Sequence, residues 1–221
     1  MSETQLFFDA IRAGDLAAVR ALLDQDTALL SAKNAQSQSP VLFSIYNQQK
    51  EICDFLVSRG VVLELHEAAA AGDLARVREL VDKDAALAGS YSSDGFPVVA
   101  LAAFFGNLEI GKYLHAKGAD INAAATNGSG YNALTAAVTS GHTEIVKWLL
   151  ESGAEPNYRY ANNYSPLLNA AANGHLEILK LLQARGADLH AKTSDGKNAL
   201  AYAEERKHAA VAEYLRAQGV S

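Results

Sequence analysis

The segment AVTSGHTEIVKWLLESGA, residues 137–154, decides the fold because it recurs along the chain. The sequence at residues 170–187 reads AAANGHLEILKLLQARGA, which places the turn glycines Gly141 and Gly174 at an offset of 33. Such a period is the signature of a repeat architecture. We predict seven copies, and the other five carry at the same register Gly14, Gln48, Gly72, Gly106 and Lys207.

Each copy has the pattern of a short alanine-rich helix, a tight turn and a longer amphipathic helix. In residues 137–154 the apolar face of the longer helix contains Ile145, Val146, Leu149 and Leu150. A glycine in SGA, KGA or RGA ends that helix, where a left-handed backbone is common. The expected N-caps of the short helices are Ser39, Asn132, Ser165 and Asn198. One unit is too small to bury a core, so neighbouring units have to stack.

The segments GADINA, GHTEIVKWLLESGAEPN and SPLLNAAANGHLEILKLLQARGADLHA resemble ankyrin repeats, in a style similar to bacterial members of that family. The resemblance implies an all-α solenoid of helix-turn-helix units, with β-hairpin fingers projecting between them. It covers nearly the whole chain, which we treat as one domain, residues 1–221. The expected units are residues 5–33, 34–62, 63–91, 92–126, 127–159, 160–192 and 193–221.

Two features depart from the family pattern. The histidine position of the family's TPLH motif is occupied, by register, by Leu42, His66, Ala100, Thr135, Leu168 and Ala201. The offset from Gln48 to Gly72 is only 24, so we expect the finger between the second and third units to be missing, near Gly60–Leu63. Residues 10–29 also match residues 68–87 at an offset of 58. We therefore expect a joint without a finger, and more labile first units.

Composition argues against several classes of function. The net charge of −6 disfavours nucleic-acid and anionic-membrane surfaces, which need clustered lysine and arginine. A single cysteine, Cys53, excludes an internal disulfide and favours a reducing, cytoplasmic location. The N-terminal residues lack the apolar core of a secretory signal, and no apolar stretch has the length of a membrane span. Charged residues at both ends predict capping units and a monomer.

Catalytic and metal-binding motifs are weak. His142, His175 and His208 share one register, but stacked units hold them too far apart for one zinc ion. The sequence ELHE at residues 64–67 fits a helix start better than a metal site, and TNGSGYN at residues 126–132 fits a lengthened finger better than a phosphate loop. We interpret Cys53 as an inert core thiol. We predict no enzyme, no cofactor and no metal.

Aromatic residues form two sets. The first follows one register of the longer helices and is interpreted mainly as packing: Phe55, Tyr113, Trp148, Leu181 and Tyr214. The second occupies finger positions (Phe96, Tyr131 and Tyr164) and the ends of the short helices (Tyr46, Phe104 and Phe105). The resemblance places these registers on a concave groove, and large aromatic residues dominate binding hot spots.

We predict a partner-binding surface made of Tyr46, Phe96, Phe104, Phe105, Tyr131 and Tyr164, with a polar rim that includes Asp94, Ser140 and Asn173. Tyr158 and Tyr160 extend the same aromatic edge. The alternative is that Phe104 and Phe105 fill the gap left by the missing finger. We expect Phe105 to lie nearer the groove and Phe104 to be the more packed.

These features predict a non-enzymatic protein–protein interaction module that binds a partner protein or peptide in a preformed groove. One alternative is a small-molecule or carbohydrate binder that uses the aromatic groove. Another is a regulatory subunit of an enzyme, which sequence alone does not separate from the first.

Overall fold

The computed structural model describes residues 2–221, and within them it contains helices and turns but no β-strand. Fourteen α-helices form consecutive pairs, each with a first and a second helix. The first helices are α1 (Glu3–Ala13), α3 (Pro40–Tyr46), α5 (Leu65–Ala71), α7 (Val98–Phe104), α9 (Ala133–Thr139), α11 (Pro166–Ala172) and α13 (Ala199–Glu205). The second helices are α2 (Leu16–Gln25), α4 (Lys50–Ser58), α6 (Leu74–Lys83), α8 (Leu108–Ala116), α10 (Thr143–Glu151), α12 (Leu176–Ala184) and α14 (Ala209–Ala217). Three 3-10 helices lie in the connections: η1 (Thr27–Ser31), η2 (Ala85–Gly89) and η3 (Ala161–Asn163).

The predicted caps are present at the helix ends. The side chains of Ser39, Asn132, Ser165 and Asn198 each accept a hydrogen bond from the backbone N–H three residues further on. These bonds satisfy donors that the first turn of a helix leaves free. Gly153, after α10, has a φ of 94°, the left-handed conformation predicted for that position. Local sequence therefore sets where these helices begin and end.

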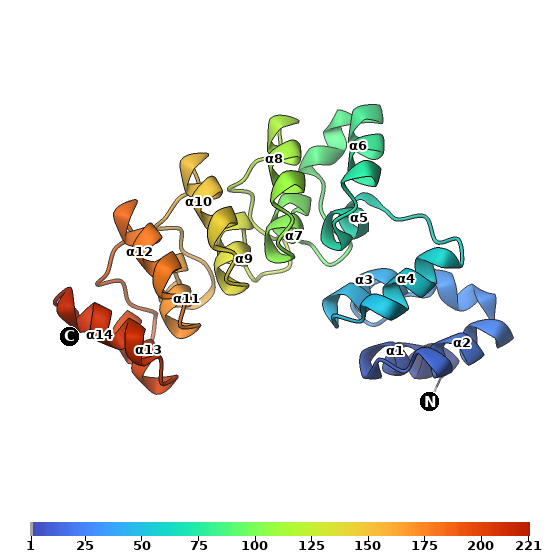
Figure 1. Cartoon of the computed structure of the whole chain (residues 1–221), viewed down its shortest axis with the longest axis horizontal. Helices are drawn as coiled ribbons and strands as arrows, with labels where there is room; N and C mark the ends of the chain where they lie inside the picture. The colour runs from blue at the N-terminus through green and yellow to red at the C-terminus, as the bar shows by residue number, and fades with distance from the viewer. Residues whose placement is uncertain (1) are drawn as a thin grey trace.

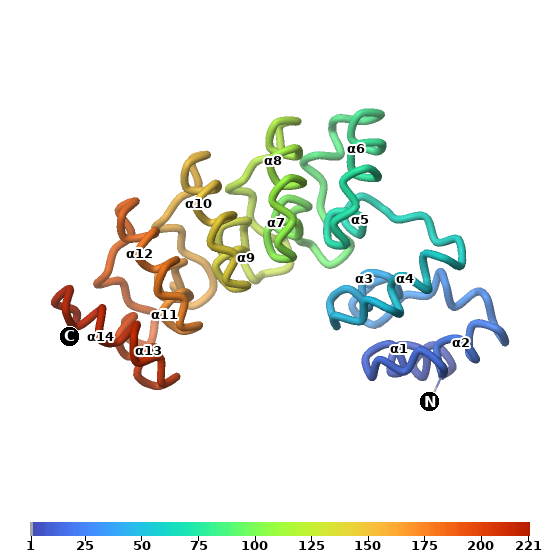
Figure 2. The backbone as a smooth tube through the Cα atoms, viewed as in Figure 1, coloured from blue at the N-terminus to red at the C-terminus, as the bar shows by residue number. Residues whose placement is uncertain are grey.

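The helix pairs stack into an arch whose two feet are the two ends of the chain (Figure 1). First helices lie on the inner side of the arch and second helices on the outer side. The direction of the helices changes between α4 and α5, since α1–α4 run across the view and α5–α10 stand upright (Figure 2). The first two pairs therefore form a block set at a large angle to the rest.

The core runs through the arch as one continuous cluster. α7 buries six of its seven residues, Val98–Ala103, because neighbours cover it on both sides. α10 buries only one face, made of Ile145, Val146, Leu149 and Leu150, as its spacing predicts. Small alanines on the first helices let successive units approach closely.

None of the described helices combines the length and the apolar character needed to cross a membrane.

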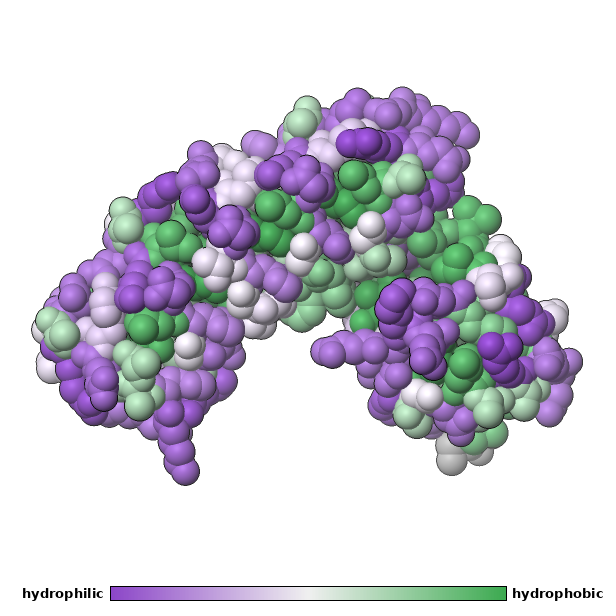
Figure 3. Space-filling model, in the orientation of Figure 1, coloured by the Kyte–Doolittle hydropathy of each residue, from purple (hydrophilic) through white to green (hydrophobic). Residues whose placement is uncertain are grey.

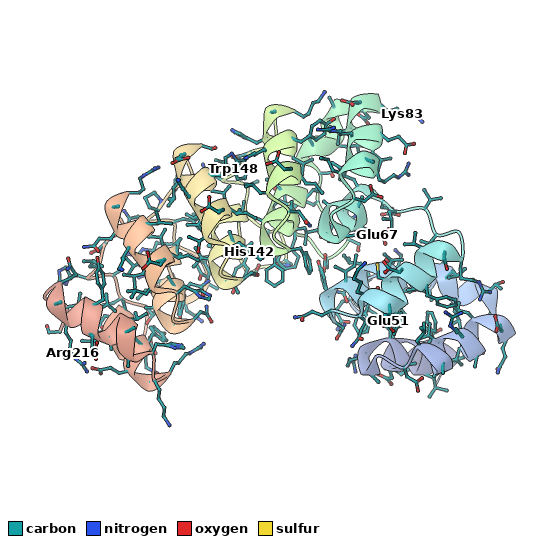
Figure 4. All side chains as sticks on the ribbon, in the orientation of Figure 1. Glu51, Glu67, Lys83, His142, Trp148 and Arg216 are labelled. Carbon is teal, nitrogen blue, oxygen red and sulfur yellow. The ribbon has the colours of Figure 1, made fainter. Side chains whose placement is uncertain are left out.

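The aromatic column on the second helices packs between neighbouring units, as predicted. Trp148 points from α10 toward α8 (Figure 4), and its ring lies where a side chain at Gly111 would have to be. Phe55 is buried, and the half-buried members that pack against the core are Tyr113, Trp148, Leu181 and Tyr214.

Histidines in the turns before α10 and α14 tie these units to the preceding ones. His142 Nε2 lies 3.0 Å from the Phe104 carbonyl oxygen, and Figure 4 shows His142 at the inner edge of the arch. His208 Nε2 lies 3.0 Å from the carbonyl oxygen of Ala172. Because these bonds end on different units, the histidines act as separate links between units.

The connections between pairs contain turns that we call finger turns, residues 34–38, 92–96, 125–131, 160–164 and 193–197. Each is closed by a backbone hydrogen bond between its end residues, for example Ser92 N–H to Phe96 O at 2.8 Å. The expected β-hairpins are reduced to isolated antiparallel bridges, of which Tyr160–Tyr164 is one. The turns are too short for the consecutive pairing that defines a strand.

The internal match between residues 10–29 and 68–87 extends in the structure from the ends of α1 and α5 to the ends of α4 and α8. α2 and α6, α3 and α7, and α4 and α8 have the same lengths, and each pair of starts has the same offset of 58. η1 and η2 obey this offset as well. The chain therefore opens with two copies of a two-pair module, in which α5 is the counterpart of α1.

The two modules meet at residues 59–64, which we call the 59–64 joint. These residues connect α4 directly to α5, and among residues 61–64 no backbone hydrogen bond closes a finger turn. Glu67 is 3% exposed and holds the joint instead. Its carboxylate accepts hydrogen bonds from the Ser39 hydroxyl and from the Glu64 backbone N–H, the latter at 2.9 Å. Figure 4 shows Glu67 facing the N-terminal block.

This geometry corrects one register assignment. The turn between α5 and α6 contains residues 72–73 only, whereas the turn between α9 and α10 contains residues 140–142. A register counted from the turn glycine Gly72 therefore assigns the TPLH histidine position to His66. In the structure Glu67 is the third residue of α5 and is equivalent to Thr135, the third residue of α9. The ELHE sequence begins α5, with Glu64 as N-cap, as the helix-start interpretation predicts.

Candidate functional site

A pocket on the inner side of the arch brings together five of the nine predicted site residues. Its volume is about 250 Å³. In Figure 3 hydrophobic residues reach the inner edge of the hollow, whereas the outer rim of the arch is largely hydrophilic. We call this site the aromatic pocket, and it is lined by Tyr46, Phe96, Ala100, Leu101, Phe104, Phe105, Tyr131 and Ala136.

The pocket is built across the 59–64 joint. The rings of Tyr46, at the end of α3, and Phe105, after α7, stack with centroids 5.8 Å apart and an interplanar angle of 18°. Phe104 packs edge-on to Phe105 at 5.1 Å. The second and fourth helix pairs therefore touch past α5, where the residues that correspond to Phe104 and Phe105 are Ala71 and Gly72, which are small.

Phe104 and Phe105 differ in exposure, which bears on whether each belongs to a partner-binding surface or fills the gap at the joint. Phe104 is 39% exposed, whereas Phe105 is half-buried between two rings. The expectation that Phe104 is the more packed is therefore wrong. The reversal follows from Tyr46, which lies in another unit and covers Phe105 from across the joint.

The Tyr46 hydroxyl is buried, and it makes no hydrogen bond within the described residues. Burial raises the pKa of Tyr46 well above its ordinary value, and the nearby Asp94 carboxylate raises the pKa further. The phenol therefore stays neutral at physiological pH. The aromatic pocket consequently presents uncharged walls to any occupant.

Asp94 lies outside the pocket and fastens the finger turns to one another. Its carboxylate accepts hydrogen bonds from the Ser92 hydroxyl at 2.5 Å and from Gln38 Nε2 at 3.0 Å. Gln38 belongs to the finger turn of the second pair, so this bond also crosses the joint. Ser140 caps the end of α9 and lines neither this pocket nor the neighbouring one.

A second, more polar pocket adjoins the first, because Tyr131 lines both. We call it the tyrosine pocket. Its volume is about 490 Å³. The predicted residues Tyr164 and Asn173 line it, together with Ser129, Thr139, Tyr160, Ala161, Asn169, Ala172 and Arg206.

Tyrosine rings form a continuous row along this pocket. Tyr160 lies 5.3 Å from Tyr131 and 5.8 Å from Tyr164, measured between ring centroids. Tyr164 contacts Tyr202 at 5.2 Å and Tyr158 lies 6.3 Å from Tyr160, so both rings extend the row. Burial raises the pKa of Tyr160 and of Tyr164. The phenols of Tyr160 and Tyr164 therefore stay neutral at physiological pH.

Sequence reasoning did not identify Leu101, Asn169 and Arg206 as site residues. Leu101 looks like a core residue, and nothing in the repeat pattern marks a position that faces a pocket. Arg206 precedes the turn of the last unit, at the register of Phe105 and Asn173, so this register is the signal that could have identified it.

The side chains in and near the two pockets limit the contacts that an occupant can make. Within residues 2–221 no three His, Cys, Asp or Glu side chains are grouped so as to hold a metal ion. Cys53 is buried on α4, and burial raises the pKa of its thiol, which disfavours the reactive thiolate. Aromatic faces, amides and one guanidinium are the groups that the pockets offer to an occupant.

Two curated proteins resemble part of the chain. "Ankyrin repeat and SAM domain-containing protein 6" of Rattus norvegicus is 33% identical over 102 residues, which are 46% of this chain and 11% of that protein. The protein of the same description from Mus musculus is 34% identical over 94 residues, 42% of this chain and 10% of that protein. The chain thus spans about a tenth of the length of these relatives.

The helix pairs, their caps and the links between their turns describe a stack of similar units. A family model described as "Ankyrin repeats (3 copies)" matches residues 65–160 and 156–221. These matches cover more than half of the chain and include the whole arch beyond the 59–64 joint. The chain belongs to the ankyrin repeat family.

Proposed function

We propose that this chain is a non-enzymatic module that binds a partner protein or peptide on the inner side of its arch. Ankyrin repeats are generally protein–protein interaction modules, and this general role is the starting point. The observation that carries the proposal is the aromatic pocket, in which rings from separate helix pairs meet around a preformed apolar cavity. Exposed apolar sites of this kind mark interaction surfaces.

The proposed contact residues have different roles. Tyr46, Phe96, Phe104, Phe105 and Tyr131 supply the apolar anchor site, and Tyr164 and Asn173 continue the surface beyond it. Ser140 and Asp94 belong to the rim, where Asp94 holds the finger turns in place. The module comprises the seven units predicted from the sequence, without a finger between the second and third.

A small-molecule or carbohydrate site is the weaker candidate for the aromatic pocket. Pockets that enclose drug-sized ligands are about 300–1,000 Å³ in volume. The aromatic pocket, at about 250 Å³, is better suited to one side chain of a larger partner. We further propose a monomer in a reducing, cytoplasmic location, which light scattering and fractionation of the source cells would test.

The proposal is tested by capturing partners from a lysate of the source organism with matched variants. Phe104→Ala removes a ring that is 39% exposed on the inner side, and Val57→Ala removes a side chain that is 38% exposed on the outer helix α4. Loss of the captured partner with Phe104→Ala and with Tyr131→Ala, but not with Val57→Ala, would support the proposal. Equal capture by all three variants would contradict it.

A further inference from the structure

The two pockets differ in chemistry although they share one wall. The aromatic pocket is lined only by aromatic and aliphatic residues. The tyrosine pocket has amide and hydroxyl groups and one cation, Arg206, and its lining contains no acidic residue among those described. We infer that the tyrosine pocket is a carboxylate subsite for an extended acidic peptide whose large apolar side chain fills the aromatic pocket. This inference rests on the proposed function and specifies its partner.

The charge of Arg206 is available to a ligand. Arg206 is exposed at the end of α13 and makes no ion pair among the described residues. Its acidic neighbours are engaged elsewhere, since Glu204 pairs with Arg216 at 2.6 Å and Glu205 pairs with Lys197 at 2.8 Å. A guanidinium binds a carboxylate through two parallel hydrogen bonds, so an acidic side chain is the group it recognises best.

The polar groups of the pocket suit an extended backbone. An extended segment leaves its backbone N–H and C=O groups in need of partners, whereas a helix satisfies its own. Asn173 Nδ2 donates to Asn169 Oδ1 at 2.5 Å, and Asn169 Nδ2 donates to the Thr139 hydroxyl at 2.7 Å. These two consecutive hydrogen bonds orient the amide of Asn173 at the surface of the pocket. The buried Tyr160 hydroxyl, with no partner in the described chain, is a further polar group of this wall.

The spacing of the helices sets the spacing of the two recognised residues. The aromatic pocket is lined mostly by residues of α7 and its finger turn, and the tyrosine pocket mostly by residues of α11 and its finger turn, where Arg206 joins the lining from the end of α13. Packed helices lie about 8–10 Å apart, so the two steps from α7 to α11 span roughly 16–20 Å. An extended chain advances about 3.3 Å per residue. The acidic residue is therefore expected about five or six positions from the apolar one.

The test is a selection from a displayed library of random peptides, each about a dozen residues long, on the immobilised full-length chain. The expected result is enrichment of peptides with one large apolar residue and an aspartate or glutamate about five or six positions away. Peptides enriched on the native chain are then titrated against Arg206→Gln and against Lys147→Gln. Lys147 is an exposed cation on the outer helix α10, so the second variant makes the same charge change away from the pocket.

We expect Arg206→Gln to weaken binding about tenfold, as the loss of one partner of a charge pair does, and Lys147→Gln to leave it unchanged. Replacing the peptide's acidic residue by its amide should weaken binding to the native chain equally, and should change nothing on Arg206→Gln. Circular dichroism and thermal melts confirm that both variants are folded.

The remaining outcomes separate the two proposals. Peptides that carry the apolar residue without an acidic one, and that Phe104→Ala releases, would overturn the carboxylate subsite and leave the proposed function standing. Enriched peptides whose apolar and acidic residues lie three, four or seven positions apart would indicate a helical ligand. That result would also overturn the subsite for an extended peptide. No enrichment above a bare support, or a dimer by light scattering that Phe104→Ala dissociates, would overturn both.

Discussion

Two joints of the same arch are held by different contacts. Between the α7–α8 and α9–α10 pairs, residues 117–132 form a full connection with a finger turn, and His142 bonds back to the end of α7. Between the α3–α4 and α5–α6 pairs, the shorter 59–64 joint relies on the buried carboxylate of Glu67.

At the shorter joint the next unit along contributes the contacts that a finger would make. The Gln38–Asp94 hydrogen bond and the Tyr46–Phe105 stack both connect the second pair to the fourth. The comparison teaches that a connection can lack a finger turn if long side chains reach past the affected unit. Of these side chains, Tyr46 and Phe105 also line the aromatic pocket, so the irregular joint and the candidate site share residues.

The largest expected effect contrasts the second positions of α9 and α5. Leu134 is completely buried in α9, whereas α5 has His66 at that position, 7% exposed. Leu134→Ala is expected to lower the free energy of unfolding by about 3 kcal/mol, as loss of a buried leucine does. His66→Ala should lower it by no more than about 1 kcal/mol. Urea denaturation measures both, and equal losses would mean that the two joints are packed alike.

The next effect concerns the hydrogen bonds that the Glu67 carboxylate accepts at the 59–64 joint. Glu67→Ala leaves the Ser39 hydroxyl and the Glu64 N–H without their acceptor, and we expect a loss of about 2 kcal/mol. Hydrogen exchange should show α1–α4 opening before α9–α12, and more so in the variant, because repeat stability is a sum of local and neighbour terms. Uniform protection along the arch would refute a labile joint. Thr135→Ala is the control at the same position of α9.

A smaller effect distinguishes the two phenylalanines. Phe105→Ala removes the stack on Tyr46 and apolar area that is half-buried, so it should cost about 1–2 kcal/mol of stability, since an aromatic pair adds about 1 kcal/mol to the effect of burial. Phe104→Ala should cost less, about 0.5 kcal/mol, because its ring is 39% exposed. A double mutant cycle of Phe105→Ala with Tyr46→Ala measures the stack directly. Independent, additive losses at Phe105 and Tyr46 would show that the two rings do not support each other.

The smallest effect concerns the turns, and it has the opposite sign. Gln48 has a φ of 58° and Lys207 a φ of 62°, at the register where most units have glycine. Side chains in this region are strained, so Gln48→Gly should raise the free energy of unfolding by about 0.5–1 kcal/mol. Gln49→Gly is the control, because Gln49 has a φ of −91°. A higher free energy of unfolding for both variants would indicate a general effect of glycine in this turn, rather than relief of strain at Gln48.

Part of the candidate site followed from register alone. Phe96 and Tyr131 were predicted from a shared position before the turn glycine, and the structure places both in the aromatic pocket. Asp94, which is predicted as part of the polar rim, accepts a hydrogen bond from Gln38 across the joint. Register tells which residues are equivalent between units, and it says nothing of contacts between units that are not neighbours.

The sequence by itself determined the helix pairs, their caps and turns, and the internal match of the first units, because these depend on interactions within one unit or between copies of one pattern. Only the tertiary structure decided which rings meet. The bend at the 59–64 joint brings Tyr46 onto Phe105, far along the chain, and leaves Phe104 exposed. Side chains so distant in sequence come together only when every helix pair between them has packed against its neighbour at a fixed angle. A local sequence pattern therefore does not predict their contact.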